Sequence, residues 1–567
     1  MKTTKNIARL AITAGLTAAL SFGGVMAPVT MAFAEDAAAT ANGSVTIANV
    51  EDNHTEFDGY QIFKADVATV EGKTVVSNIT WANGSVKAAV EGVIKNEEPT
   101  YKGKTAQDAA DWITSKVTGT NDAYCVGPDN IAYKIAAAVD DLTDKKTTSA
   151  GVASGLEHGY WLFVTDAGTI GDGEAGTSPI FTVVGSTPVN VNEKTGIPTV
   201  EKKIVSDADD KEHDAADSQI GQDVTYNLYG TVAENFDKYD TYFYEFSDQI
   251  SKGLTLQTGA KIYLYKNRSD AKGDLTRAKG TDITAYFKEE TPAEAAEDGS
   301  KTTTWTCDNL KKVSDVTKDS YIVVSYKAQI NKDAVVAGTE GNENAVTLNY
   351  SNNPMTSERG ETKPDTVKDY TYGLKINKVD LGTEAALDGA EFTIQATGAD
   401  DGASKSLYVQ KDGSLGSDPW KFVTANGGVI KVTGLDAGTY TVTEVSAPSG
   451  YAKVDPFTFE IKPSMNADDP GAGLTELTGV LTTGQNDKVI AGLTDGDSGD
   501  NKLTLKSGSE KTDGIFNITV GDTKQVGLPL TGLNGVTFTW IAGGAVLCIG
   551  VAHLIRSRKQ AEESEQE

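Results

Sequence analysis

Cysteine is scarce in this chain, with three residues among 567. Cys548 lies in an apolar run near the C-terminus, and Cys125 and Cys307 stand far apart. The sequence therefore lacks the dense cysteine spacing of a disulfide-stapled scaffold. We expect Cys125 and Cys307 to fall in different domains, and a disulfide between them stays an open alternative. Some other feature must make the folded chain durable.

Histidine is nearly as rare, with four residues in the whole chain. They are scattered at His54, His158, His213 and His553. They form no HExxH or other metal-ligand spacing, and the chain has no nucleophile-elbow glycine pattern. We therefore predict no metal, no cofactor and no enzyme active site.

Positive charge is also in deficit. The chain has 51 Lys and Arg against 80 Asp and Glu, which gives a formal net charge of −29. Nucleic acids and anionic lipids reward basic surfaces, so neither is expected as a partner. A strongly acidic surface favours solubility outside the cell.

Long apolar runs are missing except for a single stretch at residues 536–555. About 20 apolar residues suffice to cross a hydrocarbon core, and Arg556, Arg558 and Lys559 follow at once. We predict a membrane span with a cytoplasmic C-terminus. The length, position and flanking charges disfavour the alternative, a buried core helix.

The N-terminus has the pattern of an export signal. Lys2, Lys5 and Arg9 precede an apolar stretch, and the small-residue site at 32–34 comes just before Glu35. Such a pattern is typical of a secretory signal peptide that is removed on export. We predict that residues 1–34 are cleaved and that the mature chain lies outside the cell.

Between these ends, short alternating strands and turn residues favour an all-β fold of tandem immunoglobulin-like β-sandwiches. Minor helices are expected in the first domain, at 101–117 and 130–142. The predicted parts are a first domain at 35–190, a linker at 191–199, a middle domain at 200–365 and a last domain at 372–524. The clearest predicted strands are 59–67, 158–168, 223–232, 321–330, 344–354, 373–380, 439–445 and 515–522.

Residues Leu528, Pro529, Leu530, Thr531 and Gly532 stand directly before the apolar run and its basic tail. Together, residues 528–567 resemble the LPXTG sorting signal of Gram-positive surface proteins. The resemblance implies that a sortase cuts between Thr531 and Gly532 and holds the threonine carbonyl as a thioester. It also implies transfer of that acyl group to an amine, either of the peptidoglycan precursor or of another protein.

The last domain resembles the Cna B-type fold in its segments 376–394, 434–451 and 515–522. That family joins a lysine on its first strand to Asn or Asp on its last strand, with help from a glutamate. The two-residue strand period independently places Lys378, Glu444 and Asp522 at the ends of inward-facing apolar stripes. Asn517 points the other way, so we prefer Asp522 as the acceptor. The alternative interpretation is that these are strand ends reaching solvent.

The residue types suit the chemistry of amide formation. An amine is nucleophilic only when neutral, and burial favours its neutral form. A buried carboxylic acid stays protonated, polarises the acceptor carbonyl and shuttles the proton. Folding holds the amine and the carbonyl together, which replaces a bimolecular encounter. An intramolecular amide, called an isopeptide bond, would replace buried charges with a neutral link.

The middle domain has a related pattern. Lys202 alternates inward with its neighbours, and Asn344 heads an inward stripe that also contains Asn352. The segment around Asp248 resembles the part of backbone pilins whose aspartate assists amide formation. We predict a bond from Lys202 to Asn344 with Asp248 as the assisting acid, and Asn352 stays a rival acceptor. No comparable set is found in the first domain.

Lys194 follows the first domain in the place where backbone pilins have the lysine of a Val-x-Val-Tyr-Pro-Lys pattern. Asn192 and Glu193 replace the Tyr-Pro pair here. The resemblance implies that Lys194 is the amine that joins subunits, and the alternative is an ordinary linker lysine.

Taken together, these resemblances imply a sortase-assembled backbone (major) pilin, the structural subunit of a covalent cell-surface pilus or fimbria. The implied partners are sortase, identical subunits, minor pilins, peptidoglycan and a host surface ligand that adhesion would use. The alternative is a monomeric, cell-wall-anchored adhesin or a minor pilin, which would share the signals but would not need Lys194.

Overall fold

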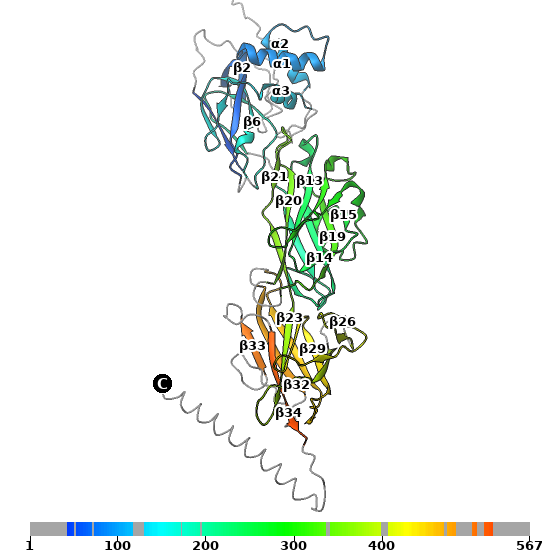
Figure 1. The fold of residues 1–567 in the computed structure, drawn as a ribbon. Coiled ribbons are helices and arrows are strands. Elements are labelled where there is room, and N and C mark those ends of the chain that lie inside the picture. The colour runs from blue at the N-terminus through cyan, green and yellow to red at the C-terminus, as the bar shows by residue number, and fades with distance from the viewer. Residues whose placement is uncertain are drawn as a thin grey trace, which may run out of the picture.

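The chain forms three β-rich domains that follow one another along an elongated molecule (Figure 1). The computed structural model describes residues 42–49, 53–70, 73–116, 130–171, 173–192, 196–335, 341–398, 406–469, 473–483, 502–506 and 515–525. Each domain has its own apolar core. The predicted all-β class, with helices confined mainly to the first domain, is confirmed.

Several sequence predictions fall outside those ranges. They are the signal peptide 1–34, Cys125, Lys194, the sorting signal 528–532, the span 536–555 and Cys548. Among the helices that the structure does describe, none is long and apolar enough to cross a membrane.

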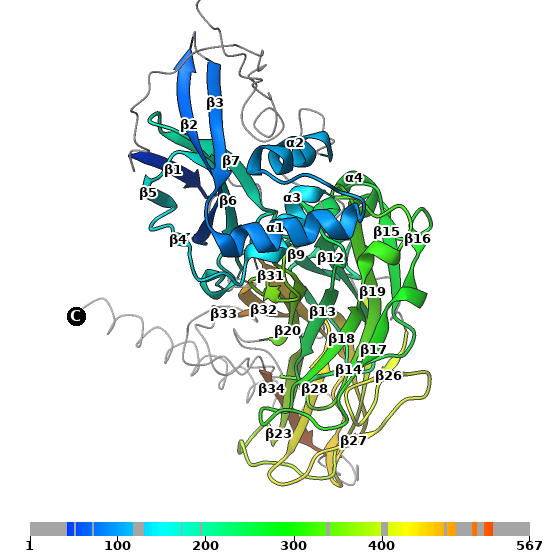
Figure 2. The same ribbon diagram turned by 90° about the horizontal axis from the view of Figure 1, so that it is seen from above.

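The first domain is a central sheet covered on both faces. The sheet has the order β3-β2-β6-β7, and β4 pairs with β2. Three helices cover one face, and a small sheet of order β5-β1-β8 covers the other, so all seven residues of β6 are buried. Figure 2 shows the helices together on one side of these strands. The elements are β1 (Gly43–Ala48), β2 (Phe57–Val70), β3 (Lys73–Trp81), α1 (Gly84–Glu97), α2 (Ala106–Lys116), α3 (Ile131–Val139), β4 (Lys146–Thr147), β5 (Val152–Leu156), β6 (Gly159–Thr165), η1 (Ala167–Thr169), β7 (Ile180–Val184) and β8 (Val189–Asn192).

The first domain reaches slightly further than the sequence indicated. β8 pairs in parallel with β1, so Val191 and Asn192 belong to the domain rather than to a linker that begins at 191. The next described strand starts at Val200. The connection between the two domains is therefore 193–199.

The middle domain is a β-sandwich of two seven-stranded sheets. One has the order β10-β9-β12-β19-β15-β16 with β14 on β19, and the other β11-β22-β20-β13-β18-β17 with β21 on β20. Because β22 pairs with β20 and β11, the sandwich extends to Tyr370 rather than 365. Its elements are β9 (Val200–Val205), β10 (Glu212–His213), β11 (Ala215–Asp217), β12 (Asp223–Thr231), η2 (Phe236–Lys238), β13 (Tyr244–Ile250), β14 (Leu254–Leu256), β15 (Lys261–Tyr265), α4 (Arg268–Lys272), β16 (Thr281–Asp282), η3 (Thr284–Tyr286), β17 (Lys288–Glu290), β18 (Lys301–Cys307), η4 (Leu310–Lys312), β19 (Tyr321–Ile330), β20 (Asn342–Ser351), β21 (Arg359–Glu361) and β22 (Asp365–Tyr370).

The last domain is a second sandwich, and its first strand lies beside its last. Its sheets have the orders β28-β23-β34-β30 and β26-β25-β24-β29-β31-β32-β33, and β27 pairs with β24. The strands are β23 (Tyr372–Asp380), β24 (Glu391–Gly398), β25 (Tyr408–Val409), β26 (Leu415–Gly416), β27 (Phe422–Val423), β28 (Val429–Leu435), β29 (Gly438–Ser446), β30 (Tyr451–Ala452), β31 (Phe457–Met465), β32 (Leu474–Thr483), β33 (Lys502–Lys506) and β34 (Ile515–Lys524).

Backbone hydrogen bonds join neighbouring domains end to end. The Gly176 amide donates to the Asn352 carbonyl at 2.6 Å between the first and middle domains. The Ile220 amide donates to the Gly434 carbonyl at 2.9 Å between the middle and last domains. Each pair of neighbouring domains is therefore joined by a defined hydrogen bond as well as by the chain itself.

Candidate functional site

The last domain buries one lysine between two carboxyl groups. β23 and β34 are parallel neighbours, with Lys378 opposite Val520 and Asp380 opposite Asp522, which places the Lys378 and Asp522 side chains on one face. The Lys378 Nζ donates to Asp522 Oδ1 and lies 3.1 Å from Glu444 Oε1. All three side chains have an exposed fraction of zero. The interpretation as strand ends in solvent is therefore wrong.

Glu444 reaches this lysine from the opposite sheet. It lies on β29, and its second oxygen, Oε2, accepts the Val454 amide at 2.8 Å. The Phe392 ring centroid is 5.4 Å from the Lys378 Nζ and closes the site against water. The glutamate is thus held in place by the backbone while its other oxygen faces the amine.

Electrostatics favour a neutral arrangement of this group. Burial and the neighbouring Glu444 raise the pKa of Asp522 to about 6, although Lys378 opposes the shift. One lysine cannot neutralise two buried carboxylates, and an uncompensated buried charge is costly. A protonated carboxyl beside an amine is the reactant pair from which an amide and water can form.

Asn517, the other acceptor considered from the sequence, is not at this site. It lies opposite Lys375 on the face of β34 that points away from Lys378. Its side chain is only half-buried, whereas Asp522 is fully buried. The structure brings Asp522 to the lysine and leaves Asn517 on the other side of the sheet.

The middle domain holds a second buried lysine in a related setting. The Lys202 Nζ on β9 donates to Asn344 Oδ1 on β20 at 2.6 Å and to the Asp248 carboxylate on β13. Lys202, Asp248 and Asn344 are all fully buried. The lysine comes from one sheet and its two partners come from the other, so these contacts span the sandwich.

The environment of Lys202 favours its neutral form. Burial lowers the pKa of Lys202 to about 8, although the Asp248 carboxylate opposes the shift. The rings of Tyr226 and Tyr326 flank the amine, with centroids 5.7 and 5.6 Å from Nζ. The neutral, nucleophilic amine is therefore far easier to reach near neutral pH than for an exposed lysine, and the adjacent Asp248 carboxylate can take up the proton.

Asn352, the rival acceptor, lies elsewhere. It is eight residues further along the chain than Asn344, about 26 Å on an extended strand. Its backbone carbonyl accepts the Gly176 amide at the interface with the first domain. Asn344, and not Asn352, is the carboxamide that contacts the lysine.

Tyr326 is a member of the middle site that the sequence reasoning missed. Its hydroxyl oxygen lies 3.1 Å from Lys202 Nζ and 2.8 Å from Asn344 Nδ2, and it donates to Asp248 Oδ2 at 2.5 Å. A signal was present, because residues 322, 324, 326 and 328 form an inward stripe on β19 with a polar tip at its centre.

In the described part of the first domain, the pair most similar to these two lysine sites is more exposed to solvent. Lys145 Nζ donates to Asp58 Oδ2 at 2.5 Å, but the lysine side chain is 38% exposed. The hydrogen bond that Lys145 donates to Asp58 raises the pKa of the lysine, which keeps the amine charged. A charged, hydrated lysine is not a nucleophile, so this pair is an ordinary ion pair.

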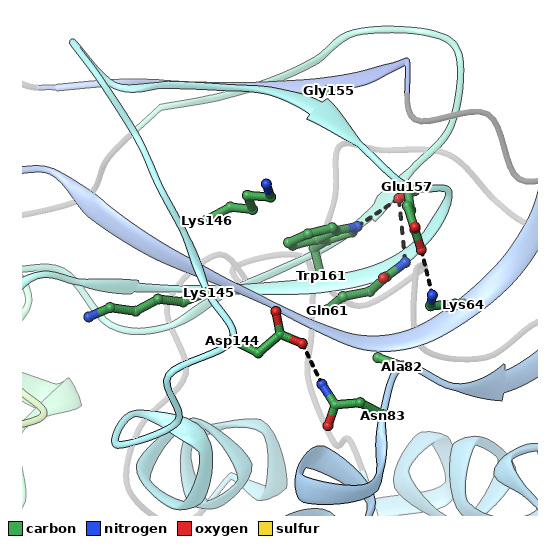
Figure 3. Close-up of a pocket in the computed structure, with 10 residues that line it drawn as sticks. All are labelled: Gln61, Lys64, Ala82, Asn83, Asp144, Lys145, Lys146, Gly155, Glu157 and Trp161. Carbon is green, nitrogen blue, oxygen red and sulfur yellow. Dashed lines mark hydrogen bonds and ion pairs between the residues drawn. The ribbon is translucent and has the colours of Figure 1, made fainter.

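A cavity of about 290 Å³ lies between β2, β4, β5, β6 and the start of α1 in the first domain (Figure 3). Several of its polar groups pair with one another. Lys64 contacts Glu157 at 2.8 Å, and the Asn83 amide donates to Asp144 at 2.8 Å. The Trp161 indole N–H donates to the Glu157 carbonyl at 2.9 Å. The cavity contains no activated nucleophile.

Metal and thiol chemistry have no counterpart in the described part of the chain. No cluster of three His, Cys, Asp or Glu residues there could hold a metal ion. Cys307 is a buried free thiol on β18. The two buried lysine sites among the described residues face the interiors of the middle and last sandwiches.

Two protein-family models match parts of this chain. Residues 220–354 match the model described as Gram-positive pilin backbone subunit 2, Cna-B-like domain. Residues 372–469 match SpaA, the prealbumin-like fold domain. The middle and last domains are therefore similar to domains found in Gram-positive pilins.

Solved structures of major pilins are similar at low sequence identity. The T6 backbone pilin of Streptococcus pyogenes is 16% identical, with 86% of this chain and 99% of that chain covered and a TM-score of 0.48. The full-length major pilin SpaD of Corynebacterium diphtheriae is 17% identical, with 85% and 98% covered and a TM-score of 0.43. BcpA, the major pilin subunit of Bacillus cereus, is 15% identical, with 85% and 99% covered and a TM-score of 0.37. No curated protein matches the chain.

Proposed function

We propose that this pilin is the backbone subunit of a covalent pilus assembled by a sortase. The sortase cleaves after Thr531, and the threonine carbonyl is transferred to the Lys194 side chain of the next subunit. The final subunit is transferred to peptidoglycan, and minor pilins join through the same chemistry. The observation that carries the proposal is the coexistence of a backbone-pilin domain at 220–354 with the LPLTG motif and a lysine at the first domain boundary.

The position of Lys194 supports its role. β8, the last strand of the first domain, ends at Asn192, and the middle domain begins with β9 at Val200. Lys194 therefore lies in the short connection between two folded domains.

We further propose that Lys378 is joined to Asp522 with Glu444 as proton shuttle, and that Lys202 is joined to Asn344 with Asp248 as the assisting acid. The support is the burial of both lysines against an acyl acceptor and a carboxyl group. The first bond releases water and the second releases ammonia. Both reactions are intramolecular and occur once per chain.

Replacing Lys194 with alanine should abolish the high-molecular-weight ladder of cell-wall extracts on SDS gels. The monomer should remain folded, because Lys194 lies between domains rather than in a core. Peptide mass spectrometry of the wild type should find Thr531 joined to the Lys194 side chain. Lys211→Ala is the matched control, because Lys211 is 71% exposed on a surface loop and should leave the ladder intact.

A ladder that persists in the Lys194→Ala variant would move the linkage to another lysine. A wild-type extract with a single band near monomer size would favour a monomeric wall-anchored adhesin instead. In that case the sorting signal would serve only for anchoring, and a host ligand would have to be sought.

The acceptor of the last domain is tested by mass. Asp522→Asn should keep the internal bond, and the deficit in intact mass from this domain should change from one water to one ammonia. Asn517→Ala should leave the deficit unchanged, because Asn517 faces away from Lys378. Loss of the deficit in Asn517→Ala would instead make Asn517 the acceptor.

A further inference from the structure

The hydroxyl of Tyr326 touches every reacting group of the middle-domain site. It contacts the amine of Lys202, the amide nitrogen of Asn344 and the carboxylate of Asp248. Asp248 forms hydrogen bonds with the lysine and the tyrosine. Among the hydrogen bonds of the described residues, it is connected to the Asn344 amide nitrogen only through the tyrosine hydroxyl. The acid therefore stands on the attacking side, and the tyrosine links it to the leaving side.

The proposed reaction needs a proton on the leaving group. The Lys202 ammonium first gives one proton to the Asp248 carboxylate, which leaves a neutral amine. Nζ then forms a bond to Cγ of Asn344 and loses a second proton. The bond from Cγ to Nδ2 breaks, and Nδ2 must gain one proton to leave as ammonia rather than as an unstable amide anion. Asp248 supplies the proton that it received first, and it then takes up the second proton from Nζ.

We propose that Tyr326 is a catalytic residue of this bond formation, acting as the relay that carries a proton from Asp248 to Asn344 Nδ2. The proposal rests on the Lys202–Asn344 bond proposed above. The hydroxyl gives its own proton to Nδ2 and takes one from Asp248. Overall, an ammonium, a carboxylate and a carboxamide become an amide, a carboxylic acid and ammonia, so atoms and charge balance.

The state of the hydroxyl suits a relay. Burial and the Asp248 carboxylate raise the pKa of Tyr326 well above its ordinary value, so the phenol keeps its proton until it is passed on. Before the reaction the hydroxyl donates to Asp248 at 2.5 Å and accepts from Asn344 Nδ2 at 2.8 Å. Once Nζ has bonded to Cγ, Nδ2 has a free lone pair, and the two hydrogen bonds can reverse by rotation of the O–H without movement of the ring. General acid–base groups within such reach contribute about 10²–10⁴-fold to a rate.

Tyr226 provides a matched control within the same site. Its ring stacks on Tyr326 with centroids 5.4 Å apart and flanks the same amine. Its hydroxyl, however, donates to Asp369 at 3.3 Å rather than to any reacting group. The two tyrosines therefore share burial and packing and differ in where the hydroxyl points.

The test follows bond closure in the full chain with time after a pulse of synthesis. Peptides containing Lys202 and Asn344 are counted as linked or separate by mass spectrometry. Tyr326→Phe should slow formation of the Lys202–Asn344 bond by about 100-fold or more, whereas Tyr226→Phe should form the bond at nearly the wild-type rate. The Lys378–Asp522 link in the same molecules serves as an internal standard for folding and should form normally in both variants.

Three outcomes would overturn the relay. They are wild-type closure in Tyr326→Phe, equal slowing in both variants, and a wild type with no Lys202–Asn344 link. The last outcome would also remove the proposed bond, whereas the first two would leave it standing. Should Tyr326→Phe fail to accumulate, 3-fluorotyrosine placed at position 326 keeps the shape and makes the phenol more acidic. The relay then predicts a shifted pH dependence of closure, and an unchanged profile contradicts it.

Discussion

Glu444→Gln should leave the last domain without its internal bond and lower the melting temperature of that domain by about 10–20 °C. The proposed bond encloses a sequence separation of 144 residues. Closing a loop of that size covalently restricts the unfolded chain and stabilises a domain by on the order of 5 kcal/mol. For a domain of this size, each kcal/mol corresponds to about 2–4 °C. The deficit of one water between the intact mass and the mass calculated from the sequence should disappear in the variant.

Glutamine is the informative replacement at this position. It keeps the volume of Glu444 and an oxygen for the Val454 amide, but it cannot shuttle a proton. Glu444→Ala should also restore the full mass, with additional loss of packing. Glu460→Gln on the neighbouring strand β31 is the control, because Glu460 forms a surface pair with Lys462 at 2.8 Å. A Glu444→Gln variant with an unchanged mass deficit would remove the glutamate from the mechanism.

The strands and inward faces of this chain were predictable because strand periodicity is local. Segment 321–330 coincides with β19, and the placement of Lys378 and Asp522 on one inward face followed from a period of two. The helix α1 at 84–97 was missed, although its signals were present. Asn83 caps it by accepting the Val86 amide, and Val86, Val90 and Ile94 form its buried stripe.

The partners across the sandwich were harder to predict because they depend on register. Asn344 and Asn352 share a face of β20 and its extension, and periodicity alone cannot separate them. Asn344 pairs with Ile250 on β13 and with Val367 on β22. This register determines its position along the strands and therefore which side chains of the other sheet it faces. Tyr326 belongs to the opposite sheet, so no spacing along the chain connects its hydroxyl with Asp248.

The proposed linkage decides which domains bear tension in a pilus. Load would enter a subunit at Lys194 and leave at Thr531, so the first domain would lie outside the load path. The middle and last domains would lie inside it, and these are the two with a buried lysine site. Among the described residues of the first domain, the nearest equivalent is Lys145 with Asp58, and that lysine is 38% exposed.

The two proposed bonds protect their domains to different extents. In the last domain, the bond joins β23 to β34, the first strand to the last, and few residues remain outside it. In the middle domain, the bond ends at Asn344, while the sandwich continues to Tyr370. Residues 345–370, which include the rest of β20 with β21 and β22, are therefore held only by hydrogen bonds and packing.

Pulling the chain between position 194 and a handle after Gln525 should reveal this difference. Each enclosed segment, with separations of 142 and 144 residues, would lengthen the chain by on the order of 500 Å if it unfolded. In the wild type neither long step should occur, and the largest step should be about 90 Å, from residues 345–370.

Lys202→Ala should restore a long step of about 500 Å from the middle domain, and Glu444→Gln should restore one from the last domain. Lys203→Ala is the control for the first change, because Lys203 is the neighbouring lysine on the opposite face, paired with Asp214. A long step in the wild type would show that the corresponding bond is absent. Absence of the short step would mean that β22 resists tension through its pairing with β11 and β20, so that hydrogen bonds alone hold the end of the middle domain.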